Sequence, residues 1–161
     1  MSVLRKLKPQ VERQLRNYRD NQLKLYQFRQ LGLHQRPTVS IRSGGRYSDP
    51  TQNEALRLLD PPAWVRSARR WGWAIQQVYE MLQRTAPKKA ILMDRLYGIE
   101  QPASHAQEPR VTQLLLVSQL EVSEPTLYKW REEILAEVAV AAIQAGALHP
   151  YDTADLRRET I

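Results

Sequence analysis

The sequence predicts an all-α protein, a helical bundle with a helix-turn-helix near its C-terminal end. Apolar residues recur at helical spacing along most of the 161 residues, and only six residues are glycine. The strongest helix signal is an unbroken, tryptophan-rich apolar stripe between residues 64 and 82. Serine or threonine precedes several of the expected helices, as N-cap residues do. We therefore expect five or six helices around one core.

Residues 1–32 are predicted to form one long basic helix. Pro9 is expected to delay its start, because proline is tolerated only in the first turn of a helix. Residues 33–49 are rich in Arg, Gly, Ser and Pro, which predicts a basic linker. The apolar stripe of the helix has residues seven positions apart, which are Leu4, Val11, Tyr18 and Leu25.

Residues 50–148 are predicted to form the main helical domain, followed by a polar tail at 149–161. The pair Pro61-Pro62 separates a short first helix from the tryptophan-rich one. The next helix is expected to end at Gly98, which is suited to a left-handed C-cap. The residues expected in the core are Trp64, Trp71, Ile75, Leu92, Leu116, Leu127 and Trp130.

Charge is distributed unevenly along the chain. The chain contains 24 Lys+Arg and 17 Asp+Glu, a net charge of +7. Residues 1–48 contain 11 cations and two acids, or +9, whereas residues 49–161 contain 13 cations and 15 acids, or −2. Such asymmetry indicates a basic segment that meets a polyanion, although a solvated helix surface has the same pattern.

The helix-turn-helix is expected at about residues 112–138, which include TQLLLVSQLEVSEPTLYKWREEI. Two helices joined by a short turn, with a serine capping the second, are typical of this arrangement. Thr112 is expected to cap the first helix and Ser123 the second. Glu121 occupies the turn position where glycine usually takes the left-handed conformation, at a cost of roughly 1 kcal/mol.

This order of helices resembles the fourth conserved region of bacterial sigma factors. Over roughly residues 10–140 it also resembles phage late-transcription activators of the RinA and ArpU type. Two sequence runs are similar to that family, VERQLRNY at residues 11–18 and LYKWR at residues 127–131. The resemblance implies a sequence-specific DNA-binding transcription regulator that activates phage late genes by contacting promoter DNA and RNA polymerase.

The resemblance also implies which residues bind DNA. Lysine can donate to guanine and glutamate can accept from cytosine N4 in the major groove. Residues expected at the groove are Ser123, Glu124, Pro125, Thr126, Tyr128 and Lys129, and those expected at phosphates are Thr112, Gln113 and Arg131. Residues 110–138 contain three cations and five acids. Tight binding therefore needs cations from elsewhere, either from residues 1–48 or from Arg66, Arg69, Arg70, Lys88 and Lys89.

Two alternative functions remain open. A small terminase subunit, which binds phage DNA for packaging, also combines a helix-turn-helix with oligomerising helices, although usually in the opposite order. A protein that binds RNA polymerase through an acidic face, without reading DNA, also fits the acidic C-terminal segment. The number of subunits distinguishes the terminase subunit from the activator, since a monomer or homodimer favours the activator.

Catalysis has little support in the sequence. His34, His105 and His149 lack metal-ligand spacing, and neither a glycine-rich phosphate loop nor a nucleophile elbow is present. We therefore expect no enzyme, catalytic residue, metal or cofactor. With no cysteine, no membrane-spanning stretch and no signal peptide, a cytoplasmic protein without membrane contact is expected.

Overall fold

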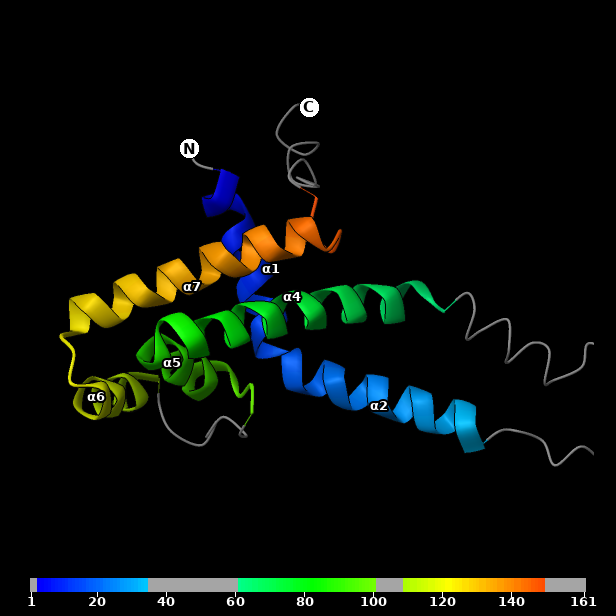
Figure 1. Ribbon diagram of the computed structural model, residues 1–161, viewed down its shortest axis with the longest axis horizontal. Coiled ribbons are helices and arrows are strands. Elements are labelled where there is room, and N and C mark those ends of the chain that lie inside the picture. The colour runs from blue at the N-terminus through cyan, green and yellow to red at the C-terminus, as the bar shows by residue number, and fades with distance from the viewer. Residues whose placement is uncertain (1–2, 35–60, 101–108, 150–161) are drawn as a thin grey trace, which may run out of the picture.

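Six α-helices and no strands form the described part of the chain, which is residues 3–34, 61–100 and 109–149 of a computed structural model (Figure 1). The all-α prediction is confirmed. Most of the expected linker, the short helix expected before Pro61 and nearly all of the expected tail lie outside the described residues. The helices are α1 (Val3–Arg16), α2 (Tyr18–His34), α4 (Ala63–Thr85), α5 (Pro87–Tyr97), α6 (Pro109–Leu120) and α7 (Glu124–Gln144).

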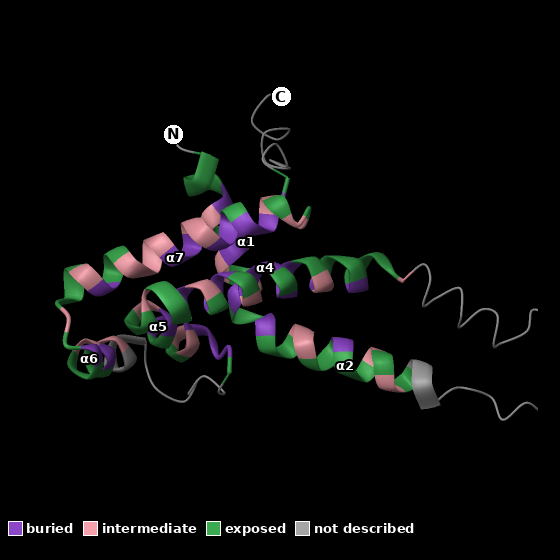
Figure 2. Cartoon of the chain, viewed as in Figure 1, coloured by how far each residue is buried: buried purple, intermediate pink, exposed green. Residues whose placement is uncertain are grey.

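The centre of the molecule is the antiparallel pair α4 and α7 (Figure 1). Helix α1 packs across α7, α2 runs beside the first half of α4, and α5 packs against α4 and α7. The buried residues lie on the facing sides of these helices (Figure 2). Each fully buried aliphatic side chain stabilises the fold by about 1.5–3 kcal/mol. The largest of them are Leu15, Ile75, Leu92, Met93, Leu127 and Ile134.

The N-terminal segment is two helices rather than the single helix predicted. Helix α1 ends at Arg16 and α2 begins at Tyr18, with Asn17 in a turn between them. The two halves bury their apolar residues against different partners, since α1 packs on α7 and α2 on α4. Backbone hydrogen bonds still flank the turn, from Asn17 N to Arg13 O at 3.0 Å and from Asn21 N to Asn17 O at 2.8 Å. The local sequence therefore gives little indication that the helix is interrupted at Asn17.

The prediction that Pro9 delays the first helix is also wrong. Helix α1 begins at Val3 and contains Pro9 in its interior. Proline removes the backbone hydrogen bond to the carbonyl of Arg5. Leu7 and Val11, one on each side of the proline, are fully buried. Their burial against the rest of the core stabilises the helix across the missing bond.

The predicted core is correct for five of its seven residues. Trp71, Ile75, Leu92, Leu116 and Leu127 are buried. Trp64 is 48% exposed instead, because it lies in the first turn of α4, where it packs edge-to-face on Phe28 of α2 at 5.7 Å. Trp130 is only partly buried and packs on the margin of the core.

Candidate nucleic-acid interface

Helices α6 and α7 are joined by a turn of three residues, 121–123, and we call the whole unit the α6–turn–α7 segment. Glu121 has φ 53°, so it takes the left-handed conformation that the sequence predicts for this position. The amide of Val122 donates to the carbonyl of Val117 at 3.3 Å. This bond, with the left-handed residue, closes the C-terminus of α6 in the manner of a Schellman motif. The turn thus redirects the chain within three residues.

Ser123 is the N-cap of α7, as predicted. Its Oγ accepts a hydrogen bond from the amide of Thr126 at 3.4 Å, and the Oγ atoms of Ser123 and Thr126 lie 2.7 Å apart. Pro125 lies in the first turn, where it costs no helix hydrogen bond. Leu127 is buried directly behind this turn. The cap and the buried leucine therefore fix the start of α7 from two sides.

The start of α6 differs from the prediction. Thr112 was expected to cap this helix, but α6 begins at Pro109 and Thr112 lies inside it. Proline is favoured in the first turn of a helix, because its missing amide needs no partner there. Gln113, the other residue expected to contact phosphate from this helix, is half-buried.

The residues predicted to enter the major groove lie together at the start of α7. Ser123, Glu124 and Pro125 are exposed, and so are Tyr128 at 57% and the Lys129 side chain at 73%. Thr126 is half-buried beside the cap. The Nζ of Lys129 lies 3.9 Å from Glu133, one turn further along the same helix. These side chains form one polar, accessible surface at the N-terminal end of α7.

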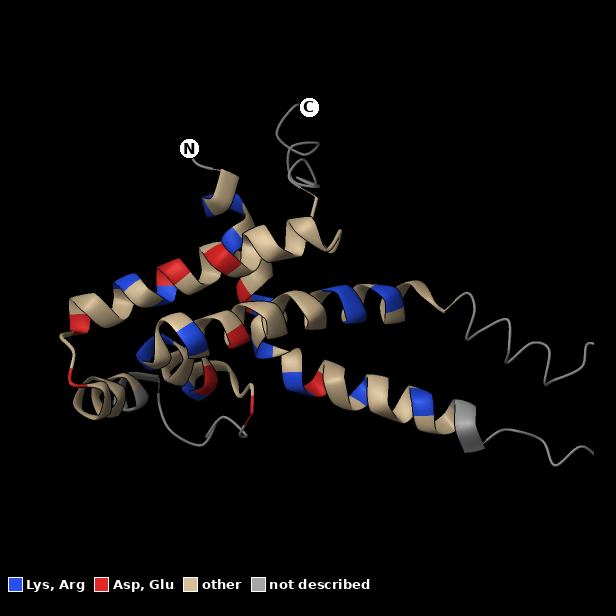
Figure 3. Cartoon of the chain, viewed as in Figure 1, with Lys and Arg blue, Asp and Glu red and all other residues tan. Residues whose placement is uncertain are grey.

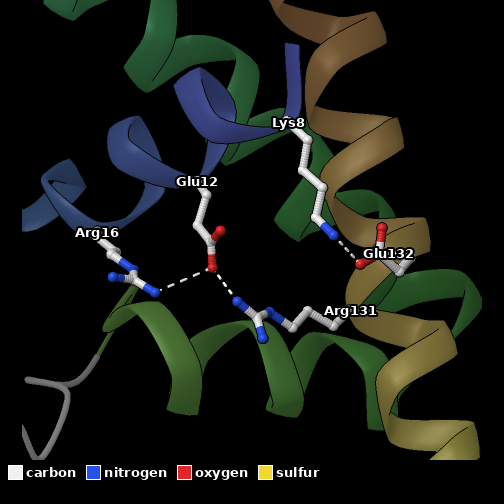
Figure 4. A network of polar contacts seen from close by, with 5 residues as sticks. All are labelled: Lys8, Glu12, Arg16, Arg131 and Glu132. Carbon is white, nitrogen blue, oxygen red and sulfur yellow. Dashed lines mark hydrogen bonds and ion pairs between the residues drawn. The ribbon is translucent and has the colours of Figure 1, made fainter. Parts of the chain in front are cut away.

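Arg131, expected to contact phosphate, has an intramolecular partner instead. Its guanidinium forms an ion pair with Glu12 of α1, and Arg16 reaches the same carboxylate at 3.2 Å (Figure 4). Burial raises the pKa of Glu12, but the hydrogen bonds and charges of Arg131 and Arg16 outweigh burial and lower it. With a side chain only 23% exposed, Arg131 connects α7 to α1 and lies apart from the surface around Lys129.

Two lysines from the segments expected to supply cations lie against α7. Lys8 of α1 pairs with Glu132, as Figure 4 shows, and Lys89 of α5 pairs with Glu133. The hydrogen bond from Lys89 lowers the pKa of Glu133. The Nζ of Lys8 also lies 6.0 Å from the ring centre of Tyr128, within reach of a cation–π interaction. Consecutive helix residues point about 100° apart, so the lysines lie on two flanks of α7.

The arginines in the first half of α4, which are Arg66, Arg69 and Arg70, lie toward the C-terminal end of α7. Arg70 donates from Nη1 to the carbonyl of Gly146 at 3.3 Å, beyond the C-terminus of α7. A helix of 21 residues is about 30 Å long. Figure 3 shows the same separation, with the cations in the first half of α4 far from the first turn of α7. Among the cations that the sequence suggests outside residues 1–48, Lys89 pairs with Glu133 of α7. Arg70 lies at the opposite end of α7 from Ser123.

Within residues 3–34, 61–100 and 109–149, no helix has both the length and the apolar character needed to cross a membrane. In the same residues, no three His, Asp or Glu side chains are grouped closely enough to hold a metal ion.

Comparison with known proteins gives no match to any family model, curated protein or solved structure. The resemblance to phage late-transcription activators therefore rests on the sequence patterns alone.

Proposed function

We propose that this chain is a sequence-specific DNA-binding protein that regulates transcription, and that the first two turns of α7 enter the major groove. The observation that carries the proposal is the α6–turn–α7 segment. In this segment, the left-handed turn at Glu121 and the Ser123 cap fix where α7 begins. Tyr128 and Lys129 near that end are exposed, and Leu127 is buried behind them. The major groove, about 12 Å wide, accepts one α-helix.

Phosphate contacts come from the flanks of α7 in this proposal. A helix in the major groove has a phosphate backbone on each side, and Lys8 and Lys89 flank α7 on two sides. In the free protein these lysines neutralise Glu132 and Glu133. On DNA, each lysine exchanges a carboxylate for a phosphate, which releases counterions from the duplex. The acidic composition of residues 110–138 is therefore compatible with DNA binding, because the fold adds cations from α1 and α5.

The biological role is proposed from the resemblance. A phage late-gene activator binds promoter DNA and contacts RNA polymerase, and we propose both partners for this chain, acting in the cytoplasm as a monomer or homodimer. The alternative, a small terminase subunit, predicts a ring of roughly eight or more copies. A native mass measurement of the full chain decides between the two roles, whichever duplex is bound.

Selection from a pool of random duplexes by the purified full chain tests the proposal. We expect one sequence to be enriched, with affinity at least about tenfold above that for a scrambled duplex, since each good base contact contributes about 1–3 kcal/mol of discrimination. The same selection with the Ser123→Pro variant, which lacks the capping hydroxyl, should enrich that sequence less. A selection in which the wild-type chain enriches no sequence contradicts the proposal.

A further inference from the structure

Helix α2 and the first half of α4 form a two-helix arm, which we call the basic arm and define as residues 18–31 and 63–72. The arm extends away from the main core past the C-terminal end of α7, with α2 on the other side of α4 from α7 (Figure 1). It contains an apolar cluster of its own, separate from the main one. That cluster consists of Leu25, Val65 and Ala68, with Phe28 packed against it.

A groove of about 610 Å³ runs along the seam between the two helices of the arm. Its apolar lining includes Phe28, Leu31, Trp64 and Ala68. Leu31 is 57% exposed and Trp64 is 48% exposed. Large apolar side chains grouped in an open groove are typical of a surface that a partner covers.

Charge determines which partner fits the groove. The arm contains six cations and one acid, Asp20. Lys24 is part of the groove lining, and the remaining polar lining residues are uncharged. A partner must therefore combine apolar side chains for the groove with carboxylates for its rim. The cations of the arm are Arg19, Lys24, Arg29, Arg66, Arg69 and Arg70.

We propose that this groove binds an acidic amphipathic helix of a partner protein, an interaction beyond the proposed DNA binding. Apolar residues of the partner fill the space between Leu31 and Trp64, and its carboxylates face Lys24. A second copy of the chain fits less well, because two arms of the same positive charge would meet. A duplex also fits less well, since phosphates gain nothing from an apolar groove.

The groove and the first turn of α7 lie at different ends of the molecule. Arg70 of the arm contacts Gly146, on the C-terminal side of α7, whereas Ser123 begins that helix. One chain can therefore hold DNA at one end and an acidic helix at the other. Loss of either activity leaves the other unchanged.

A synthetic helical peptide of about 18 residues, with a leucine stripe flanked by glutamates, is the probe. Its binding to the full chain is measured by fluorescence anisotropy, beside a peptide in which lysines replace the glutamates. We expect the acidic peptide to bind at least about tenfold more tightly. Leu31→Glu and Trp64→Ala should each weaken its binding about tenfold or more, and Lys24→Glu should remove the preference for acid.

Trp73→Ala is the matched control, because Trp73 is 51% exposed on the same helix but lies outside the groove lining. This variant should bind the acidic peptide as the wild type does, and thermal melting verifies that each variant is folded. Equal binding of both peptides, or unchanged binding by the folded Leu31→Glu variant, overturns the proposal. It is also overturned if Leu31→Glu dissociates a dimer of the chain, or if duplex competes with the peptide.

Discussion

The α6–turn–α7 segment and the basic arm use charge in opposite ways. In the segment, residues 110–138 are acidic, yet Glu132 and Glu133 are each paired with a lysine from another helix. In the arm, cations outnumber acids six to one, and one of them, Lys24, lines an apolar groove. The charge that each region presents to a partner therefore depends on which helices the fold brings together. Composition along the sequence alone would assign the polyanion to the arm.

The largest difference between the two regions should be in stability. Leu127→Ala removes a buried side chain behind the first turn of α7 and should lower the free energy of unfolding by about 3 kcal/mol. Leu31→Ala in the arm, at a position 57% exposed, should cost less than about 0.5 kcal/mol. Urea denaturation of both variants measures the two values. Similar losses would mean that the groove is covered within the chain itself.

The second difference concerns salt dependence. The double variant Lys8→Gln, Lys89→Gln removes the two lysines that pair with Glu132 and Glu133, so duplex affinity should fall. The loss of two phosphate contacts should flatten the dependence of log affinity on log salt by about 1.8. Lys24→Gln, which removes an exposed lysine from the basic arm, is the control and should leave the slope unchanged. An unaltered slope in the double variant would show that the lysines do not contact DNA.

Local features could be predicted from the sequence, and long-range ones could not. The left-handed Glu121 and the Ser123 cap follow from turn and capping chemistry within a few residues, and the structure has both. The exposure of Trp64 depends on which helices pack against the start of α4. The apolar periodicity of α4 itself does not predict this packing. The pair Lys8–Glu132 joins residues 124 positions apart, beyond any local pattern.

The candidate site was predicted in the same uneven way. The exposure of Tyr128 and Lys129 follows from helical periodicity around Leu127. The half-buried position of Arg131 does not, because it is set by the carboxylate of Glu12 on a helix distant in sequence. The sequence anticipated cations from residues 1–48, which include Lys8, and from Lys89, but it did not indicate which carboxylates they pair with.

A third prediction concerns the turn itself. Glu121→Gly should raise the free energy of unfolding by up to about 1 kcal/mol, because glycine adopts φ 53° without the steric penalty of a side chain. Glu121→Ala removes the same charge and keeps a Cβ, so it should not stabilise the protein. If both variants stabilise equally, charge rather than backbone strain explains the gain.

The smallest expected effect is a dependence of stability on pH. The pKa of Glu12 is lowered in the folded protein. Its carboxylate therefore stabilises the fold at pH values above its ordinary pKa of 4.5. This contribution is lost as pH falls through the lowered pKa. Glu12→Gln should therefore destabilise the protein at neutral pH by less than about 1 kcal/mol, and the difference should shrink below pH 4.5. Urea denaturation of the wild type and of Glu12→Gln, at neutral pH and below pH 4.5, measures the difference in free energy of unfolding. A difference that stays constant with pH would contradict the lowered pKa of Glu12.

The most direct test of DNA reading by α7 compares two lysines, one from each end of the molecule. Lys129→Ala removes an exposed cation beside the first turn of α7, and Lys24→Ala removes one from the basic arm. The ratio of affinities for selected and scrambled duplexes is measured for the wild type and both variants. We predict that Lys129→Ala lowers this ratio about tenfold or more at unchanged melting temperature, and that Lys24→Ala leaves it unchanged. An intact ratio in Lys129→Ala, or an equal fall in Lys24→Ala, would contradict the account.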